Sequence, residues 1–229
     1  MKHVNGKVVL IMNAPPGAGK DTLAGDDDWC QLVGDILLAD YQFDKGGQFQ
    51  CDVEHISFKS GIFDILSSVL HVALDFDDAN EFYDRYYDRC LKEQTWDKLG
   101  GMSPRQLMIF LSENFMKVVF GKNVFGKFSA RLASSYAYAT GGTVYVFSDG
   151  GFAEEVNEVV KSVGAENVYV LQWKAEGCSF DNDSRRYLDF DDVDDEVTFI
   201  YLPRNPKDGD IGGWKAACLA AIEEQLCKN

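Results

Sequence analysis

Four apolar stretches along the chain have the length and the bounds of buried β-strands. They run from Lys7 to Asn13, Thr143 to Asp149, Asn167 to Trp173 and Val197 to Leu202. Each is rich in β-branched or aromatic residues and lies next to a turn or a helix start, which is typical of strands. Few polar residues interrupt them, so we expect both faces to be covered, as in a parallel sheet.

Between these stretches, apolar residues recur at helical spacing, which predicts amphipathic helices. The expected apolar faces are Ile62, Leu66, Val69, Leu70 and Ala73; Leu107, Leu111, Phe115, Val118 and Val119; Val156, Val159, Val160 and Val163; and Trp214, Ala217, Cys218, Ala221, Ile222 and Leu226. We expect the second helix to begin after Ser103, with Pro104 at its first position and Gln106 completing a capping box. Strands that alternate with helices predict an α/β fold with a parallel sheet.

The stretch of about residues 61–140 contains helical patterns but no good buried strand. It is too long for one crossover connection of a minimal doubly wound sheet, so we expect an inserted helical region. The expected organisation is a single domain over residues 1–229, with a core of about residues 1–60 and 141–229.

Charge and cysteine usage narrow the choice of ligands and location. The 229 residues include 37 Asp plus Glu against 22 Lys plus Arg, a net charge of −15. Such an acidic surface repels polyanions, and we therefore expect no polymeric nucleic acid as a partner. If the protein binds a phosphate group, we expect that group to lie in a small basic pocket. The run ending at Asn13 is shorter than the roughly 18 residues of a membrane span. The cysteines form no C-x-x-C pair and no metal-ligand spacing with the histidines. We expect a cytoplasmic protein with reduced thiols and no membrane contact.

The segment from Ala14 to Thr22, APPGAGKDT, follows the first expected strand. It keeps the Gly-Lys pair of the phosphate-loop pattern G-x-x-x-x-G-K-[ST], but has Ala14 at the first glycine and Asp21 at the Ser/Thr position. Its glycines permit positive φ, and backbone N–H groups at a strand-to-helix turn converge on an anion. The expected ATP-binding residues are Pro16, Gly17, Ala18, Gly19, Lys20, Asp21 and Thr22.

Within this loop, Lys20 is expected to reach the β- and γ-phosphates and to act in catalysis. Thr22 is expected near the α-phosphate. Asp21 offers a hard oxygen ligand for Mg²⁺, either directly or through a water molecule. A Pro-Gly turn with an incidental lysine is the alternative interpretation.

Four segments in this order, GAGKDT, SPRQLM, FSDGGFAEEV and DNDSRRYL, resemble the bacteriophage deoxynucleoside monophosphate kinases of the P-loop nucleoside monophosphate kinase superfamily. The resemblance spans about residues 7–226. It implies a three-layer P-loop NTPase-type sheet, a monophosphate-binding helical region at about residues 61–140 and a lid at about residues 175–190. It also implies transfer of the ATP γ-phosphoryl group to deoxynucleoside 5′-monophosphates with Mg²⁺, for DNA synthesis, in the host cytoplasm if the chain is phage-encoded.

Phosphoryl transfer needs positive charge around the migrating group, so cations outside the loop are candidates. Lys59 matches the monophosphate-binding side of the family, and a solvated surface lysine is the alternative. Arg105 lies in the first turn of a capped helix, where the helix dipole disfavours a cation unless an anion binds there. Arg131 lies on another helix of the insertion. For both arginines a structural salt bridge is the alternative.

Arg185 and Arg186 lie where the related kinases carry their lid. Two guanidinium groups that close over the β- and γ-phosphates would neutralise charge in the transition state and exclude water. On this interpretation both are catalytic. The alternative is that they pair with the acidic run from Asp189 to Asp195.

Asp149 ends an expected strand, and the carboxyl ends of parallel strands are where α/β sheets bind ligands. We expect it to orient Mg²⁺ or the monophosphate. Phe152 is a candidate to stack on the base, with core packing as the alternative. The family frequently has an arginine two residues after this aspartate, where this chain has Gly151.

Two other functions fit the same residues. The loop fixes the donor but not the acceptor, so a kinase of another small metabolite is the first. A non-catalytic nucleotide-binding sensor is the second, although a sensor has no need of mobile cations such as Arg185 and Arg186. The sequence leaves base specificity and homodimer formation open.

Overall fold

A computed structural model describes residues 6–39, 51–135, 142–181, 183–194, 196–206 and 209–227 of the chain. The chain divides into two compact units. The first comprises Met1–Phe58 and Gly126–Asn229, and the second comprises Lys59–Phe125.

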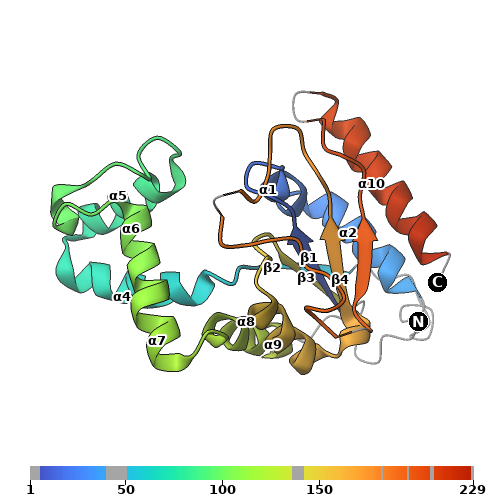
Figure 1. Cartoon of the computed structure of the whole chain (residues 1–229), viewed down its shortest axis with the longest axis horizontal. Coiled ribbons are helices and arrows are strands. Elements are labelled where there is room, and N and C mark those ends of the chain that lie inside the picture. Colours follow the sequence, from blue (N-terminus) through green and yellow to red (C-terminus); the bar gives the residue numbers. More distant parts are fainter. Residues whose placement is uncertain are drawn as a thin grey trace. The chain divides into compact units, whose positions relative to one another are not determined.

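The first unit is built on one five-stranded sheet (Figure 1). Its strands are β1 (Lys7–Asn13), β2 (Asp52–Ile56), β3 (Thr143–Phe147), β4 (Val168–Gln172) and β5 (Thr198–Tyr201). The order is β2-β3-β1-β4-β5, and all neighbouring strands are parallel. This confirms the predicted parallel α/β sheet, and four of the five strands lie where the apolar stretches predict them.

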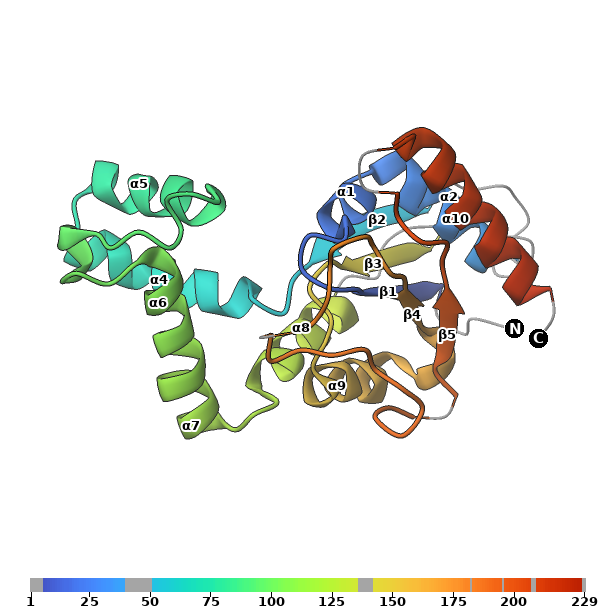
Figure 2. The same ribbon diagram turned by 45° about the horizontal axis from the view of Figure 1, so that its top comes forward.

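Helices cover both faces of this sheet (Figure 2). On one face lie α1 (Lys20–Ala24), α2 (Asp27–Leu37) and α10 (Ile211–Leu226), and on the other lie α8 (Val124–Ser135) and α9 (Ala153–Val163). A short 3₁₀ turn, η3 (Ala165–Asn167), leads into β4. The central strand β1 is accordingly buried on both sides, with Val8 to Met12 each 0% exposed.

A glycine sets the approach of α2 to the sheet. A Cβ atom at Gly34 would lie 2.3 Å from Cγ2 of Val144 on β3 and 2.6 Å from Sγ of Cys51. Only a residue without a side chain lets the helix backbone come this close. The apolar side chains of α2, including Trp29 and Val33, then pack into the same core as those of α10.

The strand order places a switch point between β1 and β4. From β1 the chain crosses to β2 at one edge, whereas from β4 it continues to β5 at the opposite edge. In open parallel sheets, ligands bind in the crevice at the carboxyl ends of two such strands. The loops that follow β1 and β4 are therefore the first place to look for a site.

The second unit is helical. It contains α4 (Ser60–Ala73), α5 (Phe76–Tyr87), the 3₁₀ turn η1 (Asp97–Leu99), and one continuous helical run made of α6 (Pro104–Ile109), the π-helix η2 (Phe110–Met116) and α7 (Lys117–Phe120). The predicted capping box is confirmed: Oγ of Ser103 accepts from the Gln106 N–H group, and Oε1 of Gln106 accepts from the Ser103 N–H group.

The predicted apolar face of this helical run is wrong in its second half, while Leu107 and Leu111 of its first half are half-buried. Phe115, Val118 and Val119 are exposed by 45%, 73% and 57%, whereas Met108 and Met116 are buried. The π-helical turns explain the difference, because a π-helix has more residues per turn than the 3.6 assumed for an α-helix.

Candidate active site

The loop after β1 begins with a tight turn. The N–H group of Ala18 donates to the carbonyl of Pro15 at 3.2 Å, and Gly17 has φ +77°. With Pro16 fixing the preceding φ, this is the pattern of a type II turn, which needs glycine at its third position. Gly19 follows with φ +87°. The loop thus uses both expected glycines in the left-handed region.

Lys20 begins α1 and folds back over the loop. Its Nζ atom donates to the carbonyls of Ala14 and Pro15 at 2.6 and 2.7 Å, and the residue is only 7% exposed. These two hydrogen bonds fix the position of the ammonium group. The loop therefore holds the Lys20 side chain at its centre.

Side chains from the segments after β4 and β5 hold the loop in place. Nε1 of Trp173 and Nδ2 of Asn205 both donate to the carbonyl of Ala18, at 2.8 and 2.9 Å. A Cβ atom at Gly19 would lie 2.5 Å from Nδ2 of Asn205, so this amide fills the space that a side chain would need.

The expected metal ligands lie apart in the sequence and have different environments. Asp21 and Thr22 are exposed on the first turn of α1. Asp149 is 8% exposed, and its carboxylate accepts from Oγ of Ser57 at 2.5 Å and from the Phe58 N–H group at 3.0 Å. The Asp149 carboxylate thus links the ends of β3 and β2. Among the described residues, no group of three or more His, Cys, Asp or Glu side chains could hold a metal ion.

The segment expected to form the lid is anchored to the sheet. Asn13, at the end of β1, donates from Nδ2 to the Arg186 carbonyl at 3.0 Å and accepts from the Leu188 N–H group at 2.9 Å. Gln172, at the end of β4, donates from Nε2 to Oδ1 of Asn13 and to the Leu188 carbonyl, both at 2.7 Å. The hydroxyl of Tyr187 donates to the Trp173 carbonyl at 2.8 Å. We call residues 185–188 the anchored segment.

Arg185 lies along Gly151. A Cβ atom at position 151 would lie 2.7, 2.9 and 3.0 Å from Cβ, Cγ and Cδ of Arg185. The guanidinium group pairs with Asp183, with Nε to Oδ1 at 2.9 Å and Nη2 to Oδ2 at 2.7 Å. The pKa of Arg185 is raised, mainly by the hydrogen bond to Asp183, and the charges of Asp149 and Glu155 act in the same direction while burial opposes them. Gly151 therefore makes room for a fixed guanidinium group near the end of β3.

Arg186 is in a different environment. Its side chain is 62% exposed and pairs with Asp189, at 3.5 Å, and with Asp192. This is the pairing with the acidic run that the sequence leaves open as the alternative. Neither arginine reaches the loop after β1 through a described contact.

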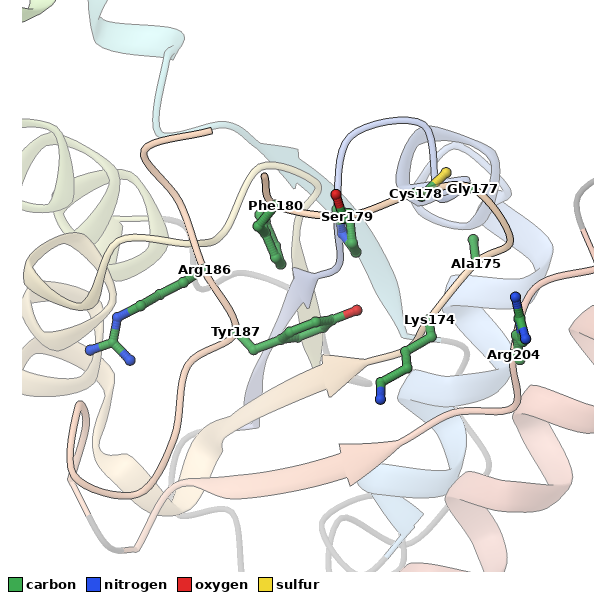
Figure 3. A pocket seen from close by; sticks show the side chains of 10 residues that line it. Lys174, Ala175, Gly177, Cys178, Ser179, Phe180, Arg186, Tyr187 and Arg204 are labelled. Carbon is green, nitrogen blue, oxygen red and sulfur yellow. The ribbon is translucent and has the colours of Figure 1, made fainter. Parts of the chain in front are cut away.

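A pocket of about 710 Å³ occupies the switch point between β1 and β4 (Figure 3). Pro15 contributes from the loop after β1, and Lys174, Ala175 and residues 177–180 contribute from the segment after β4. Of the described residues that line it, three are cations and none is acidic: Lys174, Arg186 and Arg204. Tyr187 lies between Arg186 and Lys174 (Figure 3). In a chain of net charge −15, these cations make the pocket a candidate site for an anionic ligand.

The remaining candidates lie on both units. Lys59 precedes α4 and is exposed, and Arg105 makes a 3.4 Å ion pair with Glu93, with both side chains at least half exposed. These two belong to the second unit. Arg131 is exposed on α8 of the first unit, and Phe152 is half-buried as the N-cap of α9.

Sequence reasoning missed four residues that shape the site: Asn13, Gln172, Trp173 and Asn205. All four are buried, although three of them carry amide side chains. Asn13 and Gln172 could have been found as amide side chains at the ends of apolar strands, because a buried amide there must find hydrogen-bond partners inside the protein. Asn205 in the loop after β5 had no such signal.

Comparison of the chain with models of protein families and with curated proteins gave no match. None of the helices in the described parts of the chain combines the length and the apolar composition that crossing a membrane requires. Function must therefore be argued from the site itself.

Proposed function

We propose that the chain is a P-loop kinase that transfers the γ-phosphoryl group of ATP to deoxynucleoside 5′-monophosphates. The observation that carries this proposal is the loop between β1 and α1. Its two glycines with positive φ and the buried ammonium group of Lys20 lie at the carboxyl end of the central strand of a parallel sheet. This combination of backbone shape and fixed charge suits the phosphates of a nucleotide.

The pocket beside the loop supports ATP as the donor. A nucleotide whose phosphates lie on the loop needs room for its base and sugar next to Pro15, and the pocket begins there. Lys174 and Arg204 supply positive charge, and Tyr187 supplies an aromatic surface. Pockets for nucleosides combine apolar or aromatic walls with a few polar groups in this way.

Direct in-line displacement needs no covalent intermediate, because the acceptor already carries an anionic phosphate. In this reaction Lys20 holds the donor phosphates and stabilises the charge that develops on the migrating group. Mg²⁺, which accompanies ATP in such reactions, neutralises phosphate charge. Asp21 is exposed and can hold it directly or through water. Asp149, whose oxygens already accept from Ser57 and Phe58, can do so through water.

The proposed binding of the acceptor monophosphate rests on the resemblance of the sequence to the phage kinases. We propose Lys59, Arg105 and Arg131 as cations for the monophosphate and Phe152 as a surface for its base. Arg185 fits the role of a fixed cation better than that of a mobile lid, because Asp183 and Gly151 hold it in place. A nucleotide sensor needs no mobile cations, and a fixed Arg185 is compatible with one. A non-catalytic nucleotide sensor is therefore the second candidate function.

A coupled assay with ATP, Mg²⁺ and a panel of nucleoside monophosphates tests the proposal. We expect diphosphate from at least one of dGMP, dTMP and dCMP. Diphosphate from none of them, together with phosphorylation of another small acceptor, would favour the metabolite kinase. Binding of ATP without transfer to any acceptor would favour the sensor.

A further inference from the structure

The orientation of one peptide bond decides whether the phosphate loop offers a donor or an acceptor to an anion. The peptide between Ala18 and Gly19 is trans, as are all the described peptide bonds. In a planar trans peptide, the C=O and N–H groups point in opposite directions. Whatever fixes the Ala18 carbonyl therefore also fixes the direction of the Gly19 N–H group.

Sterics alone do not fix this peptide. Gly19 has φ +87°, and a glycine populates positive and negative φ about equally well. A rotation of the peptide plane by half a turn therefore meets no Cβ atom at residue 19. In the rotated form the Ala18 carbonyl oxygen would face the place where the N–H group now points, and would repel an anion there.

Two side chains hold the plane in the observed orientation. Nε1 of Trp173 and Nδ2 of Asn205 donate to the Ala18 carbonyl at 2.8 and 2.9 Å, so both lone pairs of that oxygen are used. The two residues are 2% and 4% exposed, so water does not replace these bonds. The Gly19 N–H group consequently points away from both side chains.

Both donors are themselves fixed. The N–H group of Asn205 donates to the carbonyl of Lys174 at 2.9 Å, and Asn205 forms an isolated parallel bridge with Ala175. The ring of Trp173 packs against that of Trp214, with 6.0 Å between the ring centroids. The segments after β4 and β5, which also form walls of the pocket, thus both bond to the same carbonyl of the loop.

We propose that Trp173 and Asn205 are positioning residues for polyphosphate binding, because they hold the Ala18–Gly19 peptide so that its N–H group faces the bound phosphate. The inference rests on the proposed function, since it takes the loop to be the phosphate site. It adds two residues that touch no ligand and act through the backbone. It also explains why Asn205 occupies the space beside Gly19.

Calorimetric titration with inorganic tripolyphosphate tests this inference on Trp173→Phe, Asn205→Leu and the double variant. One donor is enough to hold the carbonyl, so each single variant should lose less than about tenfold in affinity, and the double variant more than about a hundredfold. A loss greater than the product of the single losses is the mark of a shared orienting role, whereas unrelated structural damage adds. Trp29→Phe is the matched control, because it removes a buried indole donor, to the Lys215 carbonyl at 3.1 Å, that makes no hydrogen bond to the loop.

The outcomes separate this inference from the proposed function. Affinity of the double variant within about twofold of the wild type would overturn the inference, as would equal losses in Trp29→Phe or a wild-type protein that binds no tripolyphosphate. Losses as expected, in a protein that phosphorylates no monophosphate, would support the inference and reject the kinase.

Discussion

The anchored segment gives the sharpest prediction for stability. Asn13 is fully buried, and it bonds the Arg186 carbonyl, the Leu188 N–H group and Nε2 of Gln172. Its Nδ2 atom also donates to the Gly150 carbonyl at 3.5 Å. Replacing Asn13 by leucine keeps a similar volume but removes all four bonds. A buried N–H or C=O group left unpaired costs about 1–3 kcal/mol. Asn13→Leu should therefore lower the free energy of unfolding by about 3–5 kcal/mol, a large part of a typical total of about 5–15 kcal/mol.

Gln225→Leu is the matched control. Gln225 also bridges to backbone groups, since its Oε1 accepts from the Tyr201 N–H group at 3.0 Å and its Nε2 donates to the Tyr201 carbonyl at 2.9 Å. These bonds are exposed, so water replaces them, and the loss should stay below about 1 kcal/mol.

Chemical unfolding of both variants measures these losses, and hydrogen exchange of the Leu188 amide shows whether the segment is released. Exchange at Leu188 should rise in Asn13→Leu and not in Gln225→Leu. Losses that agree within about 0.5 kcal/mol, or unchanged exchange at Leu188, would show that Asn13 does not anchor the segment.

Four further predictions concern other groups of the first unit. Gly151→Ala should destabilise the fold by about 1–3 kcal/mol, because the new methyl group displaces the stem of Arg185, and the unfolding midpoint measures it. Arg186→Ala should cost at most about 1 kcal/mol, as exposed ion pairs do, and an unchanged kcat would remove Arg186 from the chemical step. Burial raises the pKa of three thiols to about 12, so iodoacetamide at about pH 8 should label them only after unfolding, as peptide mass mapping would show. Each of these thiols has a higher pKa in the folded protein than in the unfolded protein, so the folded state binds its proton more tightly. The resulting contribution to the free energy of unfolding is complete below the unfolded thiol pKa of about 8.5 and is lost as the pH rises towards about 12. The unfolding midpoint should therefore fall over that pH range. These thiols belong to Cys30, Cys51 and Cys218.

Much of the fold could be predicted because β1, β3 and β4 are apolar runs that the parallel sheet buries on both faces. The edge strand β5 could be predicted because it keeps an apolar run with Phe199 and Ile200 buried. The strand β2 could not, since it lies at the edge of the sheet and most of its residues are exposed. Its sequence, Asp52 to Ile56, therefore carries no apolar run to reveal it. The π-helix in the second unit was missed for a related reason, because a wider helical turn leaves no simple periodicity in the sequence.

The loop of the candidate site could be predicted from Gly17, Gly19 and Lys20 because backbone conformation and charge are local properties. The partners of the arginines could not. Arg185 and Arg186 are adjacent in sequence, yet one is held by Asp183 beside Gly151 and the other pairs with Asp189 and Asp192 in the acidic run. Which pairing forms depends on how Asn13 and Gln172 anchor the intervening backbone, and that follows only from the tertiary structure.

The most direct test of the proposed phosphate site is Lys20→Met, measured beside Lys161→Met. Methionine keeps the length of the side chain but removes the ammonium group at the centre of the loop, whereas Lys161 is an exposed surface lysine paired with Glu158. Both variants should remain folded by circular dichroism. ATP-dependent formation of diphosphate should be unchanged in Lys161→Met and should fall by several powers of ten in Lys20→Met, about 3–5 kcal/mol of transition-state stabilisation. A folded Lys20→Met protein with nearly normal turnover would contradict the assignment of this loop as the phosphate site.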